Sequence, residues 1–307
     1  MLTGVAVLVL TACSSVLTDY RAEADKLEQE ISAMPGVQHV KVSIADDFVR
    51  GDSYFRLTAD LPGATEPQIR DVVTRIAGRT GTFGGLRERE FGFVVGDRAK
   101  VGAVKELDAD ALLDAVRNVR QYTASMPDGR IVWGVRPTPK ISVMDVKTST
   151  AEPLTAIRTM IGARTAAEVS IETTRFERWS VDLPLSAERE AEFRRQLPET
   201  PWAADFVVIK NSHIIQLSVK NTEPAPFDAD LTYDQLADAV RKLGPTTDYP
   251  LRLDWTGFFY YSDGKRNIGS VHAAGCDYSL ATVSDDTLSG PALTVQRRMR
   301  AEFGGCR

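Results

Sequence analysis

The stretch TEPQIRDVVTRIAGR, residues 65–79, has the pattern of an amphipathic helix and is followed by two runs typical of strands. Thr65 and Gln68 have the spacing of a capping box, which satisfies free N–H groups in the first helical turn. The apolar residues on one helical face are Ile69, Val72, Val73 and Ile76. The alternating apolar residues of the next run are Phe91, Phe93 and Val95, and residues 101–104 form a second run. This segment therefore predicts a helix followed by two strands.

The same order of elements recurs along the chain. Helices are predicted to begin near residues 22, 65, 108, 150, 187 and 232, each followed by two apolar runs. The period of roughly 40 residues lies in the range of internal repeats. Because each helix has one apolar stripe, it must cover one face of the sheet that the strands form. We expect an α+β protein of tandem helix–strand–strand repeats, with antiparallel sheets and the helices on one face.

The later repeats differ in the strength of their signals, and the sixth has the best signal for a helix start. Asp108 and Ser186 are predicted to cap two helices, and Thr232 with Gln235 predicts a second capping box. The fifth helix has a thin apolar stripe, formed by Ala191, Phe193 and Leu197.

The corner Met34-Pro35-Gly36-Val37, followed by Val40, resembles the helix-to-strand corner of ferredoxin-like domains. It is also similar to the BON domains of bacterial envelope proteins, which use pairs of helix–strand–strand units. The resemblance implies that the repeats pair into ferredoxin-like or BON-like domains, which we place at residues 20–105, 106–184 and 185–307. The last domain ends in a helix that Ser289 is expected to cap. No Cys-x-x-Cys precedes the first helix, so metal transfer is not implied.

The segment Leu10-Thr11-Ala12-Cys13 closes a short apolar run that begins at Val5. It resembles the lipobox of bacterial lipoproteins, in which the preceding peptide is removed and the cysteine sulfur receives a diacylglyceryl group. The resemblance implies a signal peptide at residues 1–12, lipidation of Cys13, a tether at residues 13–19 and an extracytoplasmic protein anchored to a cell membrane by acyl chains such as palmitate. The alternative is an ordinary N-terminal helix with an unmodified cysteine.

Composition limits the partners. The chain of 307 residues has a formal net charge of −5. It therefore lacks the overall basic balance of proteins that bind phosphate backbones, and we expect no nucleic-acid partner. If Cys13 carries lipid, Cys276 and Cys306 remain as a pair, and such a pair usually forms a disulfide bond outside the cytoplasm. The alternative is two free thiols.

No catalytic set is recognisable in the sequence. The three histidines, His39, His213 and His272, have no neighbours at metal-ligand spacing, so we predict no metal and no cofactor. The one unusual cluster is aromatic and lies at residues 255–261. Its candidate surface residues are Trp255, Phe259 and Tyr261, which form either an exposed platform for a ligand or a hairpin whose rings pack together.

Three functional hypotheses follow. The favoured one is a lipid-anchored cell-envelope protein that acts as a binding adaptor or scaffold for an envelope protein or glycan, and not as an enzyme. The second is a carrier of lipid or a small molecule, which requires an apolar cavity between sheet and helices. The third is an enzyme with an unrecognised site, which a pocket holding perturbed carboxyl groups would favour.

Overall fold

The structure is a computed structural model. It describes residues 8–47, 52–86, 88–162, 164–198, 201–223, 226–262, 265–275 and 285–305. The cysteines Cys276 and Cys306 lie outside these ranges, and the side chain of Cys13 is not described either.

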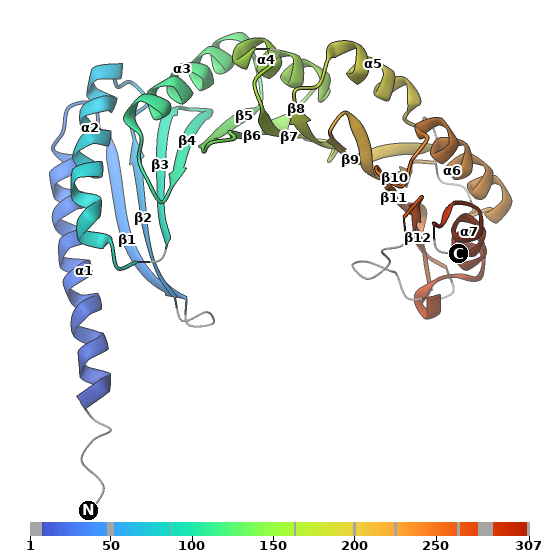
Figure 1. The fold of residues 1–307 in the computed structure, drawn as a ribbon, viewed down its shortest axis with the longest axis horizontal. Helices are drawn as coiled ribbons and strands as arrows, with labels where there is room; N and C mark the ends of the chain where they lie inside the picture. Colours follow the sequence, from blue (N-terminus) through green and yellow to red (C-terminus); the bar gives the residue numbers. More distant parts are fainter. Residues whose placement is uncertain are drawn as a thin grey trace, which may run out of the picture. The chain divides into compact units, whose positions relative to one another are not determined.

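The chain is α+β and alternates one helix with two strands (Figure 1). The helices are α1 (Leu8–Ser32), α2 (Glu66–Arg79), α3 (Ala109–Ser125), α4 (Ala151–Ile161), α5 (Ala187–Gln196), α6 (Ala229–Leu243) and α7 (Gly290–Phe303), with short 3-10 helices at Thr80–Phe83 and Asp285–Thr287. The strands are β1 (His39–Asp47), β2 (Asp52–Asp60), β3 (Glu88–Gly96), β4 (Ala99–Val104), β5 (Arg130–Val135), β6 (Lys140–Val146), β7 (Ala167–Thr173), β8 (Arg178–Leu183), β9 (Trp202–Lys210), β10 (His213–Asn221), β11 (Leu251–Ser262) and β12 (Lys265–Ala273).

The strands form one mixed sheet, and their order in the sheet is their order in the chain. The two strands that share a repeat pair antiparallel, as β3 does with β4. Strands of successive repeats pair parallel, as β2 does with β3 and β4 with β5. The prediction of separate antiparallel, ferredoxin-like sheets is therefore wrong. A helix between two adjacent strands returns the chain to the same end of the sheet, so the next strand runs parallel.

The chain divides into two compact units, Met1–Ser142 (unit 1) and Val143–Arg307 (unit 2). The domain boundary predicted near residue 105 lies within unit 1, between the paired strands β4 and β5. The boundary predicted near residue 184 lies within unit 2, between the paired strands β8 and β9.

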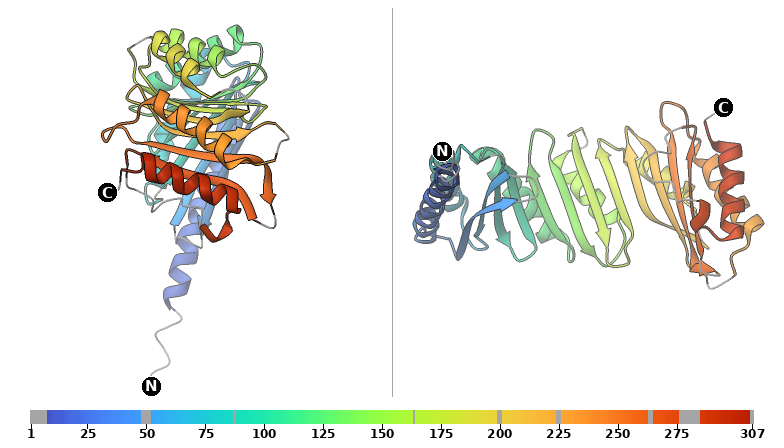
Figure 2. Two further views of the ribbon diagram at one scale, coloured as in Figure 1. Left: turned by 90° about the vertical axis from the view of Figure 1, so that its right-hand side faces the viewer. Right: turned by 90° about the horizontal axis from the view of Figure 1, so that it is seen from below.

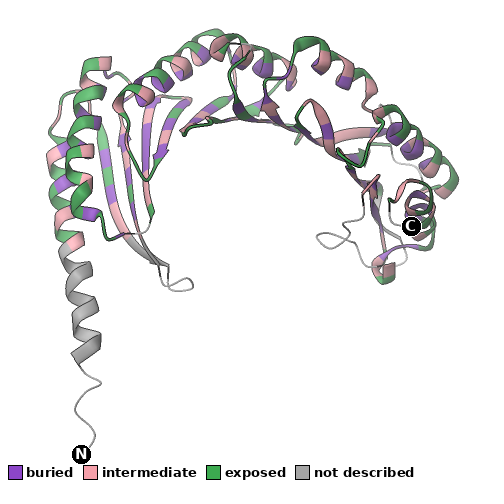
Figure 3. Ribbon diagram, viewed as in Figure 1, coloured by how far each residue is buried: buried purple, intermediate pink, exposed green. Residues whose placement is uncertain are grey.

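In unit 1, the helices cover one face of the strands, and buried residues recur along both layers (Figure 3). The predicted stripe of α2 is buried: Ile69, Val72, Val73 and Ile76. The predicted capping box begins this helix, with the Thr65 N–H donating to Oε1 of Gln68 at 2.8 Å. Asp108 caps α3 as predicted, because its Oδ1 accepts from the N–H groups of Asp110 and Ala111.

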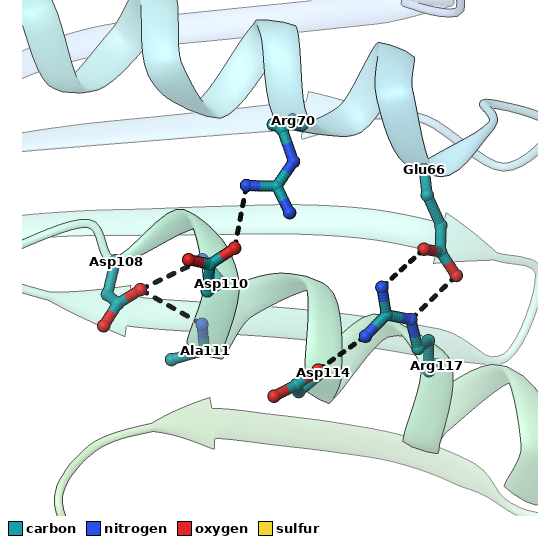
Figure 4. A network of polar contacts seen from close by, with 7 residues as sticks. All are labelled: Glu66, Arg70, Asp108, Asp110, Ala111, Asp114 and Arg117. Carbon is teal, nitrogen blue, oxygen red and sulfur yellow. Dashed lines mark hydrogen bonds and ion pairs between the residues drawn. The ribbon is translucent and has the colours of Figure 1, made fainter.

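Ion pairs join α2 to α3 on the solvent side (Figure 4). Nε and Nη2 of Arg117 donate to the two carboxylate oxygens of Glu66 at 2.9 and 2.7 Å. Arg70 pairs with Asp110 at 2.7 Å. All of these side chains are largely exposed, so the pairs add little stability and chiefly fix the helices side by side.

In unit 2, the predicted start of α5 is confirmed and that of α6 is not. Ser186 caps α5 as predicted. The prediction that Thr232 and Gln235 begin α6 is wrong by one helical turn, because Asp228 is the cap and accepts from the Leu231 N–H at 2.9 Å. An aspartate is among the strongest N-caps, so the helix begins there. Gln235 instead accepts a hydrogen bond from Nε1 of Trp202 at 2.9 Å.

The outer strands of the two units are covered. Helix α7 packs beside β12 (Figure 2). Buried Gln296 of α7 accepts from the Ser270 N–H at 3.0 Å, and the Ser289 N–H donates to the Arg266 carbonyl at 3.0 Å. In unit 1, a carboxylate oxygen of Glu28 in α1 accepts from the Val42 N–H of β1 at 2.7 Å. Blocking free strand edges in this way prevents pairing with other chains.

Helix α1 begins at Leu8, so the backbone of residues 13–19, the predicted tether, is helical. Among the described residues, no helix combines the length and the apolar character that crossing a membrane requires.

Candidate binding groove on the open face of unit 1

The face of the unit 1 strands opposite the helices carries a groove. Strand residues alternate between the two faces. In β3, Phe91, Phe93 and Val95 are buried on the helix side, which places Glu90, Gly92 and Val94 on the open face.

Three glycines line up across neighbouring strands on this open face. The strand register pairs Gly92 of β3 with Gly102 of β4, and Gly102 with Gly134 of β5. Thr58 of β2 is the partner of Gly92 and continues the row. Since three of the four positions have no side chain, the row is a trough in the sheet surface. We call it the glycine groove.

Two rows of side chains form the walls of the glycine groove. The register places Arg56, Glu90 and Val104 side by side along one wall, and Arg136 follows two residues after Gly134. It places Asp60, Val94, Lys100 and Val132 along the other wall. The resulting depression has a volume of about 210 Å³ and is lined by residues of all four strands and by Arg136 after β5.

The lining of the groove carries an excess of positive charge. The charged residues that line the depression are Arg56, Glu90, Lys100 and Arg136, and the wall of Lys100 also carries Asp60. Arg56 and Glu90 neutralise each other in an ion pair of 2.7 Å. Lys100 and Arg136 are exposed and have no ion-pair partner within the described part of the chain. Lys100 and Arg136 therefore stand without an ion pair, one on each wall, and Asp60 on the wall of Lys100 offsets part of this positive charge.

A second depression adjoins the first. It has a volume of about 550 Å³ and shares Val104, Val135 and Arg136 with the glycine groove. Its other lining residues are Lys105, Glu106, Asp108, Ala111 and Pro137, and Val104 is 42% exposed. The groove thus opens at one end onto a surface of mixed apolar and charged residues near the start of α3.

Of the three aromatic residues predicted as a ligand platform, Trp255 is the one whose side chain the structure describes. Trp255 is buried, with 2% exposure, and packs over Gly269, where an added Cβ would lie 2.1 Å from the indole ring. The side chains of Phe259 and Tyr261 lie outside the described residues, although the backbone of both belongs to β11.

The three histidines belong to three different strands, β1, β10 and β12. His39 is exposed at the start of β1, and His213 stacks on Tyr249 with ring centroids 3.7 Å apart. Among the described residues, no group of three or more His, Cys, Asp or Glu side chains could hold a metal ion.

One half-buried carboxyl group stands out in unit 2. Burial raises the pKa of Asp205, while its own N–H and that of Phe206 lower it. The carboxyl Oδ1 has no hydrogen-bond partner in the described part of the chain. Asp205 lies where the register between β9 and β10 shifts, which explains how a strand can turn a carboxyl group away from solvent.

Sequence reasoning missed the glycine groove, although a signal was present. Each glycine interrupts a run of strand residues, as in Phe91-Gly92-Phe93 and Trp133-Gly134-Val135. A glycine inside a strand often marks a place where a ligand or another backbone approaches closely. The register that aligns the three glycines could not be derived without knowing that the repeats join into one sheet.

Comparison with known proteins gives no match: no family model, no curated protein and no solved structure is significantly similar to this chain.

Proposed function

We propose that this protein is a lipid-anchored binding module of the bacterial cell envelope, and that the glycine groove of unit 1 is its binding surface. The observation that carries the proposal is the pair of cations Lys100 and Arg136, which have no ion-pair partner in the described part of the chain and stand on opposite walls of a trough with a backbone floor. Natural proteins use side chains to fill the exposed face of a strand, and a row of glycines leaves backbone available to a partner.

The anchor of the proposal is Cys13, through the lipobox resemblance of residues 10–13. Two acyl chains on this sulfur would hold the protein at a membrane, at ~0.8 kcal/mol per buried CH₂ group. The test is labelling of growing cells with radioactive palmitate. The wild type is expected to take up label and to sediment with membranes, whereas Cys13→Ser should do neither. An unlabelled, unprocessed wild-type chain would contradict the anchor.

A disulfide bond between Cys276 and Cys306 belongs to the same proposal. Ala273 and Gly304 form an isolated bridge, and the Gly305 N–H donates to the Gly275 carbonyl at 3.2 Å. Each cysteine directly follows one of these glycines. Thiol titration of the lipidated protein under denaturing conditions is expected to find no free thiol before reduction and two free thiols after it.

The test of the binding function is affinity capture from the solubilised envelope of the protein's own host. The baits are the lipidated wild type, Gly102→Val, which fills the groove, and Arg21→Gln, which removes an exposed cation from α1. An added Cβ at Gly102 would lie 3.4 Å from the Phe91 carbonyl oxygen, which is an ordinary van der Waals contact.

The wild type and Arg21→Gln are expected to retain the same partner, and Gly102→Val to lose it at an unchanged melting temperature. Equal retention by all three baits would overturn the groove as the binding surface. A lipid or small molecule that stays with the purified wild type, in place of a captured partner, would favour the carrier hypothesis.

A further inference from the structure

We infer that the glycine groove takes an extended, acidic polypeptide segment of its partner. The inference rests on the proposed binding function and adds the chemical class of the partner. Its starting point is the arrangement of charge: the groove has one neutralised pair, Arg56 with Glu90, and two unpaired cations. A partner that places carboxylates over Lys100 and Arg136 is complementary to this charge.

The shape of the groove favours an extended chain. The row runs from Thr58 on β2 to Gly134 on β5 and so crosses three spacings between strands. At about 4.8 Å per spacing this is roughly 14 Å, the length of about four residues of extended polypeptide. The floor between the walls consists of glycine backbone, which is partly exposed at Gly102 and Gly134 and is covered by the Lys100 side chain at Gly92.

The positions of the two cations also match an extended peptide. Lys100 stands on one wall and Arg136 on the other, on either side of the glycine row. Successive side chains of an extended peptide point to opposite sides. Two neighbouring acidic residues of the partner can therefore reach one cation each.

The Lys100 side chain is already placed over the floor. An added Cβ at Gly92 would lie 3.0 Å from Cε and 3.4 Å from Nζ of Lys100. The Lys100 ammonium group therefore lies over the glycine groove at Gly92, where a carboxylate of a bound chain can accept its hydrogen bonds.

A polysaccharide is the less favoured partner. Phe91 is the one aromatic residue in the lining, and its side chain is buried on the helix side. Proteins commonly hold sugar rings against exposed aromatic faces, and this groove presents none among its lining residues. Charge alone would not distinguish an acidic glycan from an acidic peptide, so the glycan is an outcome of the test.

The experiment measures fluorescence anisotropy with a labelled hexaglutamate peptide and the full mature chain. Hexaserine tests for binding without charge, and polygalacturonate tests an acidic glycan. The expected result is saturable hexaglutamate binding that weakens with added salt, with no binding of hexaserine. Lys100→Gln and Arg136→Gln should each raise the dissociation constant about three- to fivefold. Gly102→Val should raise it by at least tenfold, and Arg21→Gln should leave it unchanged.

Each other outcome has a defined meaning. The inference is overturned if hexaglutamate does not bind, or if its dissociation constant is the same for the wild type and the groove variants. Tighter binding of polygalacturonate with the same dependence on Lys100 and Arg136 also overturns it, in favour of an acidic glycan. If hexaglutamate fails while Gly102→Val still abolishes capture from the envelope, the inference falls and the proposed function stands. If capture is also unaffected, both fall.

Discussion

Glu190 shows how a single residue departs from the helical pattern of the sequence. The predicted apolar stripe of α5 included Ala191, which is exposed, while Glu190 is buried in its place. The carboxylate forms an ion pair with Arg158 of α4 and accepts from Nε of Arg194 at 2.8 Å. The Arg194 guanidinium lies 3.9 Å from the ring centroid of Trp179. A charged cluster thus replaces the apolar contact between α4 and α5, and periodicity of apolar residues could not reveal it.

Removing this carboxylate should destabilise unit 2 strongly. In Glu190→Ala, Arg158 loses its partner while its side chain stays 12% exposed, so a buried cation is left uncompensated. The expected loss is about 3–5 kcal/mol in the free energy of unfolding, measured in urea. The control is Glu192→Ala, whose exposed pair with Arg189 should cost less than ~1 kcal/mol. Equal losses in both variants would show that Glu190 is not the centre of the cluster.

For Tyr122 we predict the opposite effect, a gain in stability when its polar group is removed. Its hydroxyl is buried and has no hydrogen-bond partner among the described residues, and burial raises the pKa of Tyr122 above its usual range. Tyr122→Phe should therefore raise the free energy of unfolding by about 1 kcal/mol, because an unsatisfied group is removed. Tyr233→Phe is the matched control and should lose stability, since this hydroxyl donates to Glu302. A destabilised Tyr122→Phe would indicate that the hydroxyl has a bound water.

At the scale of elements, apolar periodicity predicted the alternation of helices and strands and the buried stripe of α2 correctly. It placed the start of α6 one turn late, because Asp228 is a stronger cap than Thr232. It missed the length of α1, which extends back to Leu8. Boundaries depend on single capping residues, whereas the existence of an element depends on a pattern of several residues.

The docking of α7 on α6 should depend on pH. The pKa of Glu302 lies below its ordinary value of 4.5, first because the Tyr233 hydroxyl donates to its carboxylate and then because Arg241 does. A carboxyl group with a lowered pKa in the folded state stabilises the fold above its ordinary pKa, and this contribution is lost as the pH falls.

Amide hydrogen exchange of residues 290–303, corrected for intrinsic rates, measures this docking. Protection should fall between pH 6 and pH 3. In Glu302→Gln the protection at pH 6 should already be lower and should change less with pH. The pair between Arg298 and Asp230 also joins α7 to α6, so some protection should survive in the variant. Identical pH profiles for both proteins would contradict the role of Glu302.

At the scale of the whole molecule, the main error of sequence reasoning concerned how repeats join. The Met34–Val37 corner suggested closed, paired domains, whereas the strands continue in chain order in one mixed sheet. Apolar alternation gives the buried face of each strand but not its neighbour, and a helical crossover fits either arrangement. The glycine groove depends on that neighbour relation, since Gly92, Gly102 and Gly134 come from three different strands.

The uncovered sheet face is also where the central claim can be tested in the cell. Lysines are labelled with an amine-reactive reagent in intact envelopes and in the purified protein, and the extent of labelling is compared by mass spectrometry. Lys100 reports on the glycine groove. Lys210, an exposed residue at the end of β9, reports on a surface outside it.

If the groove is the binding surface, Lys100 should be labelled less in the envelope than in the purified protein, while Lys210 should be labelled equally in both. Gly102→Val should restore the labelling of Lys100 in the envelope. A Lys100 that reacts in the envelope as fully as it does in the purified wild type would contradict the account.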